Sequence, residues 1–394
     1  MKSYLALRVG GLLALVACVF ATASCTSGAR GPDETTQPAT RGTLIIAGGG
    51  LKDELALVWS RFLASKASGP IGIVPTSSGV ADEAVAAVKA AIATHGLGAI
   101  ECFEVAIRAG DLEAANDADV VASIDRAGGL WMVGGDQSRL TAALIKADGT
   151  DTPALAAMRR VLDRGGVIGG TSAGAAAMSR VMILGNDPEQ WLRLHLSGNV
   201  AAMQMGRGLG FLDWAITEQH VLSRGRLARL AVVCLHSTTR LGLAVADDRA
   251  IVVDRSTGRV EALGGHACLV IDNRTSDGRV WLLDHGDSIA LRDGKLVATA
   301  NSEAVQSTAI ANGVSETFRD WWARGVVLGQ FGALAGGKAR AVSNGSLVRA
   351  TLTRDGRTAV FTTPAGGESG VVSGGYSVFD AGLSVEPTVG GAAR

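Results

Sequence analysis

The chain has 394 residues, of which 47% are hydrophobic and only 4% aromatic, and its 53 glycines are about twice the share usual in globular proteins. Its 37 Lys and Arg residues balance 37 Asp and Glu residues, so nothing global favours nucleic acid or an anionic membrane surface as a partner. This composition excludes collagen, coiled-coil and low-complexity classes and suits a buried parallel sheet under helices.

The N-terminal segment has the pattern of an export signal. Lys2 and Arg8 precede an apolar or small stretch over residues 9–23, which is too short to cross a hydrocarbon core of ~30 Å comfortably. Residues 26–40 are rich in Gly, Pro, Ser and Thr, the composition of a flexible linker. We therefore expect a signal peptide over residues 1–25 and an exported protein.

Two ways of processing this leader compete. Ala21-Thr22-Ala23 fits a signal-peptidase site, whereas the residues before Cys18 and before Cys25 resemble bacterial lipoprotein signals. We favour Cys25 as a lipidated first residue, which would anchor the protein in the bacterial cell envelope; cleavage at the signal-peptidase site would instead leave it secreted.

The three remaining cysteines are Cys102, Cys234 and Cys268. Each stands beside apolar residues and none forms a C-x-x-C pair, so no metal site is expected. Buried free thiols are the simpler interpretation, since at most one disulfide can form among three cysteines.

From Arg41 onward, short apolar runs alternate with longer amphipathic stretches. We expect strands at 43–47, 71–74, 99–105, 130–133 and 167–168, and helices at 51–67, 80–94 and twice within 138–164. Such repeated βα units predict right-handed crossovers and an α/β, doubly wound, mostly parallel sheet with helices on both faces. Ligands of such sheets bind beyond the carboxyl ends of the strands.

After about Leu241 the pattern changes to β-like runs separated by dipeptides that suit hairpin turns. These dipeptides are Asp277-Gly278, Asp293-Gly294, Asn344-Gly345 and Asp355-Gly356. We expect the domain that carries the chemistry over 41–300 and a β-rich C-terminal extension over 301–394. Trp321-Trp322 in that extension is expected to pack in a core.

One pentapeptide suggests a nucleophile. Gly170-Thr171-Ser172-Ala173-Gly174 matches G-x-S-x-G and stands between an expected strand and the helix-prone run 175–181. A nucleophile elbow needs glycines on both sides because its turn is too tight for side chains. A glycine-rich turn without chemistry is the alternative.

A serine nucleophile also needs a base and an acid that orients the base. His220 is the best candidate among six histidines because it ends the strand-like run 214–219, which places it at the same rim as Ser172. His195 and His236 fall on expected helices and are interpreted as packing or surface residues. Three acids lie between serine and histidine, and spacing does not choose among them: Asp187, Glu189 and Glu218.

Two further groups fit this chemistry. Gly134-Gly135 follows a strand, so its amides, with that of Ala173, are candidate donors of an oxyanion hole. Arg224, Arg226 and Arg229 lie at an expected helix start, where cations oppose the helix dipole, and their guanidinium groups suit bidentate carboxylate binding.

Taken in order, four blocks of residues 41–300 resemble the cyanophycinase family of serine peptidases, which also holds aspartyl dipeptidases. The blocks are Gly134 to Gln137, Gly169 to Ala175, Gly208 to Leu212, and Glu218 to His220 with Arg224 to Leu230. The resemblance implies a flavodoxin-like fold related to class I glutamine amidotransferases, and an exopeptidase without metal or organic cofactor. It also implies that the enzyme cleaves cyanophycin, a poly-aspartate with arginine on each β-carboxyl, into β-aspartyl-arginine dipeptides.

Carried over by position, the resemblance makes Ser172 the nucleophile, His220 the general base and Glu189 its orienting acid. The backbone amides of Gly135 and Ala173 would hold the oxyanion. The matching substrate-binding residues are Gln137, Gln219, Arg224, Arg226 and Arg229. The chain departs from the family at Glu218, where the family usually has Asp, in a short insertion between Glu189 and His220, and in an extension without a recognised counterpart.

Two other functions stay open from the sequence. One is a related peptidase for other aspartyl or isoaspartyl peptides, and the other is a non-catalytic surface binding lipoprotein on the same fold. The expected partners are the peptide substrate and, through a lipid on Cys25, a membrane; a homodimer is left open.

Overall fold

A computed structural model describes residues 41–50, 56–96, 99–185, 187–275, 278–301, 305–306, 316–318, 340–344, 348–353, 358–362 and 376–387. Several predictions lie outside these residues: the signal peptide with Cys18 and Cys25, the linker 26–40, Trp321-Trp322, and turns at Asp277, Gly345 and Asp355-Gly356. Among the helices that the structure describes, none is long and apolar enough to span a membrane.

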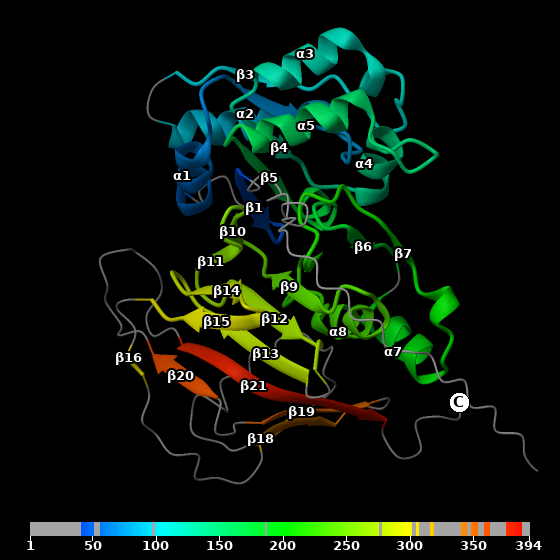
Figure 1. The fold of residues 1–394 in the computed structure, drawn as a ribbon, viewed down its shortest axis with the longest axis vertical. Helices are drawn as coiled ribbons and strands as arrows, with labels where there is room; N and C mark the ends of the chain where they lie inside the picture. The colour runs from blue at the N-terminus through cyan, green and yellow to red at the C-terminus, as the bar shows by residue number, and fades with distance from the viewer. Residues whose placement is uncertain are drawn as a thin grey trace, which may run out of the picture. The chain divides into compact units, whose positions relative to one another are not determined.

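The first sheet carries the predicted parallel strands (Figure 1). Within the described residues it has nine strands in the order β15 (Lys295–Thr299), β14 (Ser288–Arg292), β11 (Arg259–Leu263), β10 (Ala250–Asp254), β1 (Thr43–Ala47), β5 (Val167–Thr171), β4 (Gly129–Met132), β2 (Ile71–Val74) and β3 (Cys102–Glu104). The strands from β1 to β3 pair in parallel, and those from β10 to β15 continue antiparallel. The order β3-β2-β4-β5 reverses direction at β2, as in flavodoxin-like sheets, so the predicted α/β fold class is confirmed.

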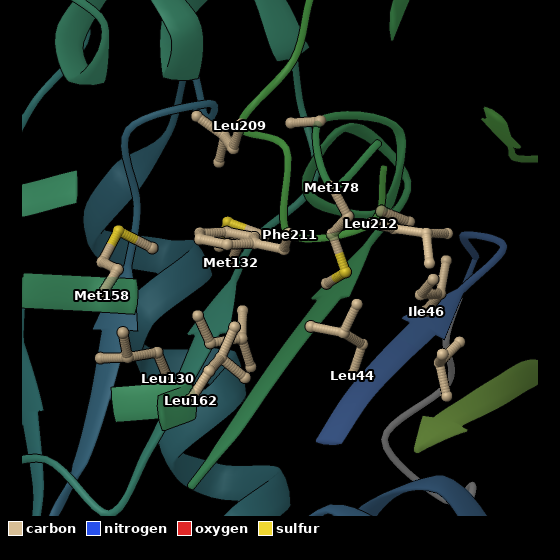
Figure 2. Close-up of a cluster of buried hydrophobic side chains, with 14 of the residues drawn as sticks. Leu44, Ile46, Leu130, Met132, Met158, Leu162, Met178, Leu209, Phe211 and Leu212 are labelled. Atoms are coloured by element: carbon tan, nitrogen blue, oxygen red, sulfur yellow. The ribbon is translucent and has the colours of Figure 1, made fainter. Parts of the chain in front are cut away.

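Helices cover both faces of this sheet. Successive residues of a strand point to opposite faces, so neighbouring side chains of β1 pack against different helices. Ile45 and Ala47 pack with α1 (Ala56–Ser65) and α2 (Ala81–His95). Leu44 and Ile46 belong to the opposite core, which includes Met178 (Figure 2). The helices of that second face are α3 (Ala118–Arg126), α4 (Gln137–Leu144) and α5 (Pro153–Asp163).

The second sheet is mostly antiparallel and contains the described strands of the C-terminal part, which the sequence predicts to be β-rich. Its described strands follow the order β17 (Glu316–Phe318), β18 (Arg340–Asn344), β19 (Val348–Thr353), β21 (Tyr376–Pro387), β13 (Gly278–Leu283), β12 (Cys268–Asp272), β9 (Leu241–Val245) and β8 (Ile216–Glu218), with β20 (Ala359–Thr362) on β21 and β16 (Val305–Gln306) on β20. In the first sheet, the hairpin predicted at Asp293-Gly294 is confirmed between β14 and β15, with φ of 47° and 74°.

The segment from β5 of the first sheet to β8 of the second contains α6 (Ala173–Ala176), β6 (Val181–Ile183), α7 (Pro188–Leu196), η2 (Val200–Ala202) and β7 (Met205–Arg207). Outside it, η1 (Ala114–Asn116) lies between β3 and α3, and α8 (Leu227–His236) joins β8 to β9. Helix α8 packs against β8 and β9 in a core of its own, and α7 packs beside it.

Two local expectations differ from the structure. Gly169 and Gly170 lie inside β5, where they pair with Ile45 and Ile46 of β1, rather than after the end of the strand. Glycine is needed at position 170 because a Cβ there would come 2.8 Å from the carbonyl carbon of Gly174 in the following helix. Of the helix-prone run 175–181, only residues 175–176 are helical, at the end of the short α6; after it Ser179 Oγ donates to the Val181 carbonyl at 2.7 Å and the chain enters β6. The thiols of Cys102, Cys234 and Cys268 are free, and the last two are buried.

Candidate active site

Ser172 stands on the sharp turn between β5 and α6. Its φ of 51° is a left-handed conformation that is rare outside glycine, and its amide donates to the Ala47 carbonyl of β1 at 3.1 Å. The glycine at position 174 is required because a Cβ there would lie 2.8 Å from the Met132 Cβ of β4. The local structure is therefore the strained elbow that the G-x-S-x-G motif predicts.

His220 lies two residues after the end of β8 and faces Ser172. The Oγ of Ser172 lies 2.9 Å from Nε2 of His220, and the imidazole side chain is only 8% exposed. The backbone of His220 also has a positive φ, of 53°, and its amide donates to the Gly48 carbonyl at 2.8 Å. The two side chains that the sequence nominates as nucleophile and base are thus brought within hydrogen-bond distance.

The carboxylate at the other ring nitrogen belongs to Asp247, in the turn between β9 and β10. Its Oδ1 forms a short hydrogen bond with Nδ1 of His220. Because a carboxylate only accepts hydrogen bonds, Nδ1 carries the proton and Nε2 is left to accept one from Ser172. This arrangement has the connectivity of a Ser-His-Asp triad.

The structure does not bring Glu189 to His220, and this corrects the acid taken from the resemblance. Glu189 lies in the first turn of α7 and pairs with Arg193 one helical turn later, at 2.6 Å, with 42% of its side chain exposed. The other two candidates are also engaged elsewhere: Asp187 caps α7 by accepting from the amide of Gln190, and Glu218 pairs with Arg229.

Burial and charge set the protonation of the pair. Burial lowers the pKa of His220, with smaller contributions from Arg224 and Arg226, and Asp247 opposes them. Burial raises the pKa of the Asp247 carboxyl, but hydrogen bonds from Ser223 and His220 outweigh it and leave the pKa below its usual range. At neutral pH the site therefore holds a neutral imidazole between a hydroxyl and a carboxylate, the state that a general base needs.

The turn after β4 lies alongside the nucleophile. A Cβ on Gly134 would be 3.5 Å from the Cβ of Ser172, and Gly135 has a φ of 141°. Any side chain on Gly135 would overlap the carbonyl oxygen of Ser77, whose own hydroxyl donates to the Val133 carbonyl at 2.7 Å. The turn is therefore fixed close to Ser172.

A second amide comes from the start of α6. Ala173 is the first residue of that helix, where an amide has no acceptor within the helix. The two residues whose amides are predicted to form the oxyanion hole, Gly135 and Ala173, thus lie close to the nucleophile on two different elements. Ser172 and Gly135 both line the pocket described next.

Ser172 opens into a pocket of about 660 Å³. All five residues predicted to bind substrate line it: Gln137, Gln219, Arg224, Arg226 and Arg229. Asp136 and Asp187, which cap α4 and α7, line it as well. The pocket thus combines cationic and anionic groups beside a nucleophile.

The three arginines are not equivalent. Arg229 is 3% exposed and donates to Glu218 through Nε at 2.5 Å and Nη2 at 2.9 Å, so its charge is balanced under the pocket. Arg226 donates to Oε1 of Gln219 at 2.6 Å, and burial, with the nearby charge of Arg229, lowers its pKa to about 10, which leaves it charged at neutral pH. Within the described residues, the Arg224 guanidinium has no ion-pair partner.

Gln137 has one end of its amide fixed. Its Nε2 donates to the Ile183 carbonyl of β6 at 2.8 Å, so its amide oxygen is the atom left to accept hydrogen bonds from other groups.

Among the residues that the structure describes, no group of three or more His, Cys, Asp or Glu side chains is arranged to hold a metal ion. The arrangement suits acyl transfer from a substrate that carries carboxylates.

Comparisons with known proteins agree with this chemistry. Residues 44–260 match the family model of peptidase family S51. The chain is 32% identical over 169 residues to the cyanophycinase of Geminocystis herdmanii, which is 42% of this chain and 58% of that protein. It is 30% identical over 247 residues to the cyanophycinase of a Nostoc species, covering 61% and 76% of the two chains.

A solved structure of a peptidase from an acI-B1 actinobacterium is also similar. It is 17% identical, covers 68% of this chain and 98% of its own, and superposes with a TM-score of 0.43.

Proposed function

The chain belongs to peptidase family S51, and we propose that it is a serine exopeptidase that cleaves cyanophycin into β-aspartyl-arginine dipeptides. One observation carries the proposal: the hydrogen-bonded series Ser172, His220 and Asp247 opens into a pocket lined by arginines. The curated relatives named above are cyanophycinases, which supports the same substrate.

The proposed reaction is acyl transfer in two steps. Ser172 Oγ attacks the scissile carbonyl while Nε2 of His220 takes its proton, and Asp247 stabilises the imidazolium that forms. The amides of Gly135 and Ala173 donate to the oxyanion, and each such donor is typically worth about 10²–10³ in kcat. His220 then gives that proton to the leaving amine. In the second step water gives a proton to His220 and attacks the acyl-enzyme, and His220 returns the proton to Ser172 Oγ as the acid product leaves.

The charges of the pocket fit a substrate with groups of both signs. Each repeating unit of cyanophycin presents a carboxylate and a guanidinium on its side chain. We propose that Arg224 and Arg226 pair with the carboxylate, since guanidinium and carboxylate form directed, charge-assisted hydrogen bonds. The carboxylates of Asp136 and Asp187 at the same pocket would face the guanidinium.

The direct test is to incubate the purified protein with insoluble cyanophycin and identify soluble products by mass. We expect β-aspartyl-arginine dipeptides from the wild type and none from Ser172→Ala. Ser197→Ala, at the end of α7, is the matched control and should be fully active. Undiminished hydrolysis by Ser172→Ala would overturn the serine mechanism.

The same assay distinguishes the substrate class. Aspartyl and isoaspartyl dipeptides without arginine should be poor substrates beside cyanophycin, because they lack the arginine side chain. A preference for these dipeptides would instead favour a related aspartyl peptidase. A wild-type protein that neither hydrolyses any of them nor reacts with a serine-directed phosphonate would support a binding lipoprotein.

We propose as well that residues 1–25 direct export and that Cys25 carries the lipid. Bacteria expressing the full chain with a labelled fatty acid should place the label on the wild type and not on Cys25→Ala. Cys18→Ala is the control and should keep the label. Unlabelled wild-type protein in the cytosol would contradict this proposal.

A further inference from the structure

We propose that the segment Ala47-Gly48-Gly49 at the end of β1 is the backbone template of the active site, and that Gly49 is a positioning residue for His220. The inference rests on the serine chemistry proposed above, not on the identity of the substrate. Three successive carbonyl oxygens accept backbone hydrogen bonds: Ala47 from Ser172 at 3.1 Å, Gly48 from His220 at 2.8 Å and Gly49 from Asp248 at 2.9 Å. Consecutive residues of one strand end thus hold the nucleophile, the base and the turn that carries the acid.

The template lies where the two sheets meet. Strand β1 pairs with β5, which leads to Ser172, and with β10, which follows the turn of Asp247. His220 and Asp247 come instead from the ends of β8 and β9 in the second sheet. Approach of that sheet requires glycine at position 48, since a Cβ there would overlap the carbonyl oxygen of Ala246.

Gly49 sets the position of the imidazole itself. Its φ of +113° is unfavourable for any side chain, and a Cβ would overlap Cε1 and Nε2 of His220 and lie 2.9 Å from Nδ1. The ring therefore packs directly against the α-carbon of Gly49. The edge that makes this contact includes Nε2, the nitrogen that accepts the proton from Ser172. A methyl group at position 49 has to displace the ring from both Ser172 and Asp247.

The test measures the rate at which a fluorophosphonate labels Ser172, which needs no knowledge of the natural substrate. Gly49→Ala should lower this rate by about 10²-fold, the effect expected for a base displaced by about 1 Å. It should also remove the downfield proton resonance of the His220 Nδ1–Asp247 hydrogen bond. Gly165→Ala is the control: this glycine also has a positive φ, of +89°, but no atom lies within 4 Å of a Cβ there, so labelling and resonance should be unchanged.

A double mutant separates a positioning role from a general loss of stability. In the His220→Ala background, Gly49→Ala should lower labelling by less than about 3-fold further, because the two residues act as one unit. If Gly49→Ala does not fold, the double mutant should fold again, since removing the ring makes room for the methyl group. The inference is overturned if the losses of the two single mutants multiply in the double mutant, or if Gly49→Ala is labelled like the wild type. It is also overturned if the double mutant fails to fold as well. An unlabelled wild type would instead refute the proposed function.

Discussion

Replacing Asp247 with Asn tests the assignment of the orienting acid. The amide keeps the size of the carboxylate, but it can donate to Nδ1 and so favours the tautomer in which Nε2 carries the proton and cannot accept it from Ser172. His220 is 8% exposed and Asp247 30%, so water does not readily replace the lost partner. We expect kcat to fall by about 10⁴-fold, or about 5.4 kcal/mol of transition-state stabilisation, with KM nearly unchanged.

Dipeptide release from cyanophycin and fluorophosphonate labelling both measure this effect. Glu189→Gln is the matched control, because it makes the same chemical change at an exposed pair that contributes about 0.3–0.5 kcal/mol to stability. It should leave kcat unchanged. The reasoning fails if Asp247→Asn keeps more than a tenth of the wild-type kcat, or if Glu189→Gln loses as much activity as Asp247→Asn.

Three further predictions concern the pocket, the oxyanion turn and pH. Arg224→Gln should raise KM about 10-fold with little change in kcat, since it removes one charge-assisted hydrogen bond of ~1.4 kcal/mol; an unchanged KM would show that Arg224 does not touch the substrate. Gly135→Ala should lower kcat by about 10²-fold or more because its Cβ overlaps Ser77, whereas equal losses in binding and folding would point to general disruption. Because burial holds the pKa of His220 below its ordinary value of about 6.5, kcat/KM should stay constant as pH falls to that value and decline only below it; a decline above pH 7 would contradict the assignment.

The sequence predicted those site residues whose signal is local. Ser172 is marked by its flanking glycines, and His220 by its position at a strand end. The sequence does not point to Asp247, because this residue comes 27 residues after His220 whereas the three candidate acids lie between serine and histidine. A signal existed, since Asp247 also ends a strand-like run, but its meeting with His220 depends on the packing of two sheets, which no spacing along the chain encodes.

Glu189 shows the opposite case. On a helix, its spacing of four residues from Arg193 is the pattern of an exposed side-chain pair, and the structure contains that pair on α7. The glycines of β5 are a related case: the sequence predicts that the strand ends at residue 168, because small residues are typical of turns and of close packing alike. Only the tertiary contact with α6 shows that packing applies at Gly170.

The long strand β21 changes how the C-terminal extension is understood. It pairs with β13 inside the sheet whose other end, through β8 and β9, delivers His220 and Asp247. An unpaired β13 would present open backbone groups to other chains, the condition that favours edge-to-edge aggregation. For protein engineering, the boundary at residue 300 that composition suggests is therefore a poor place to truncate, because the extension supplies the neighbour of a strand in the catalytic scaffold.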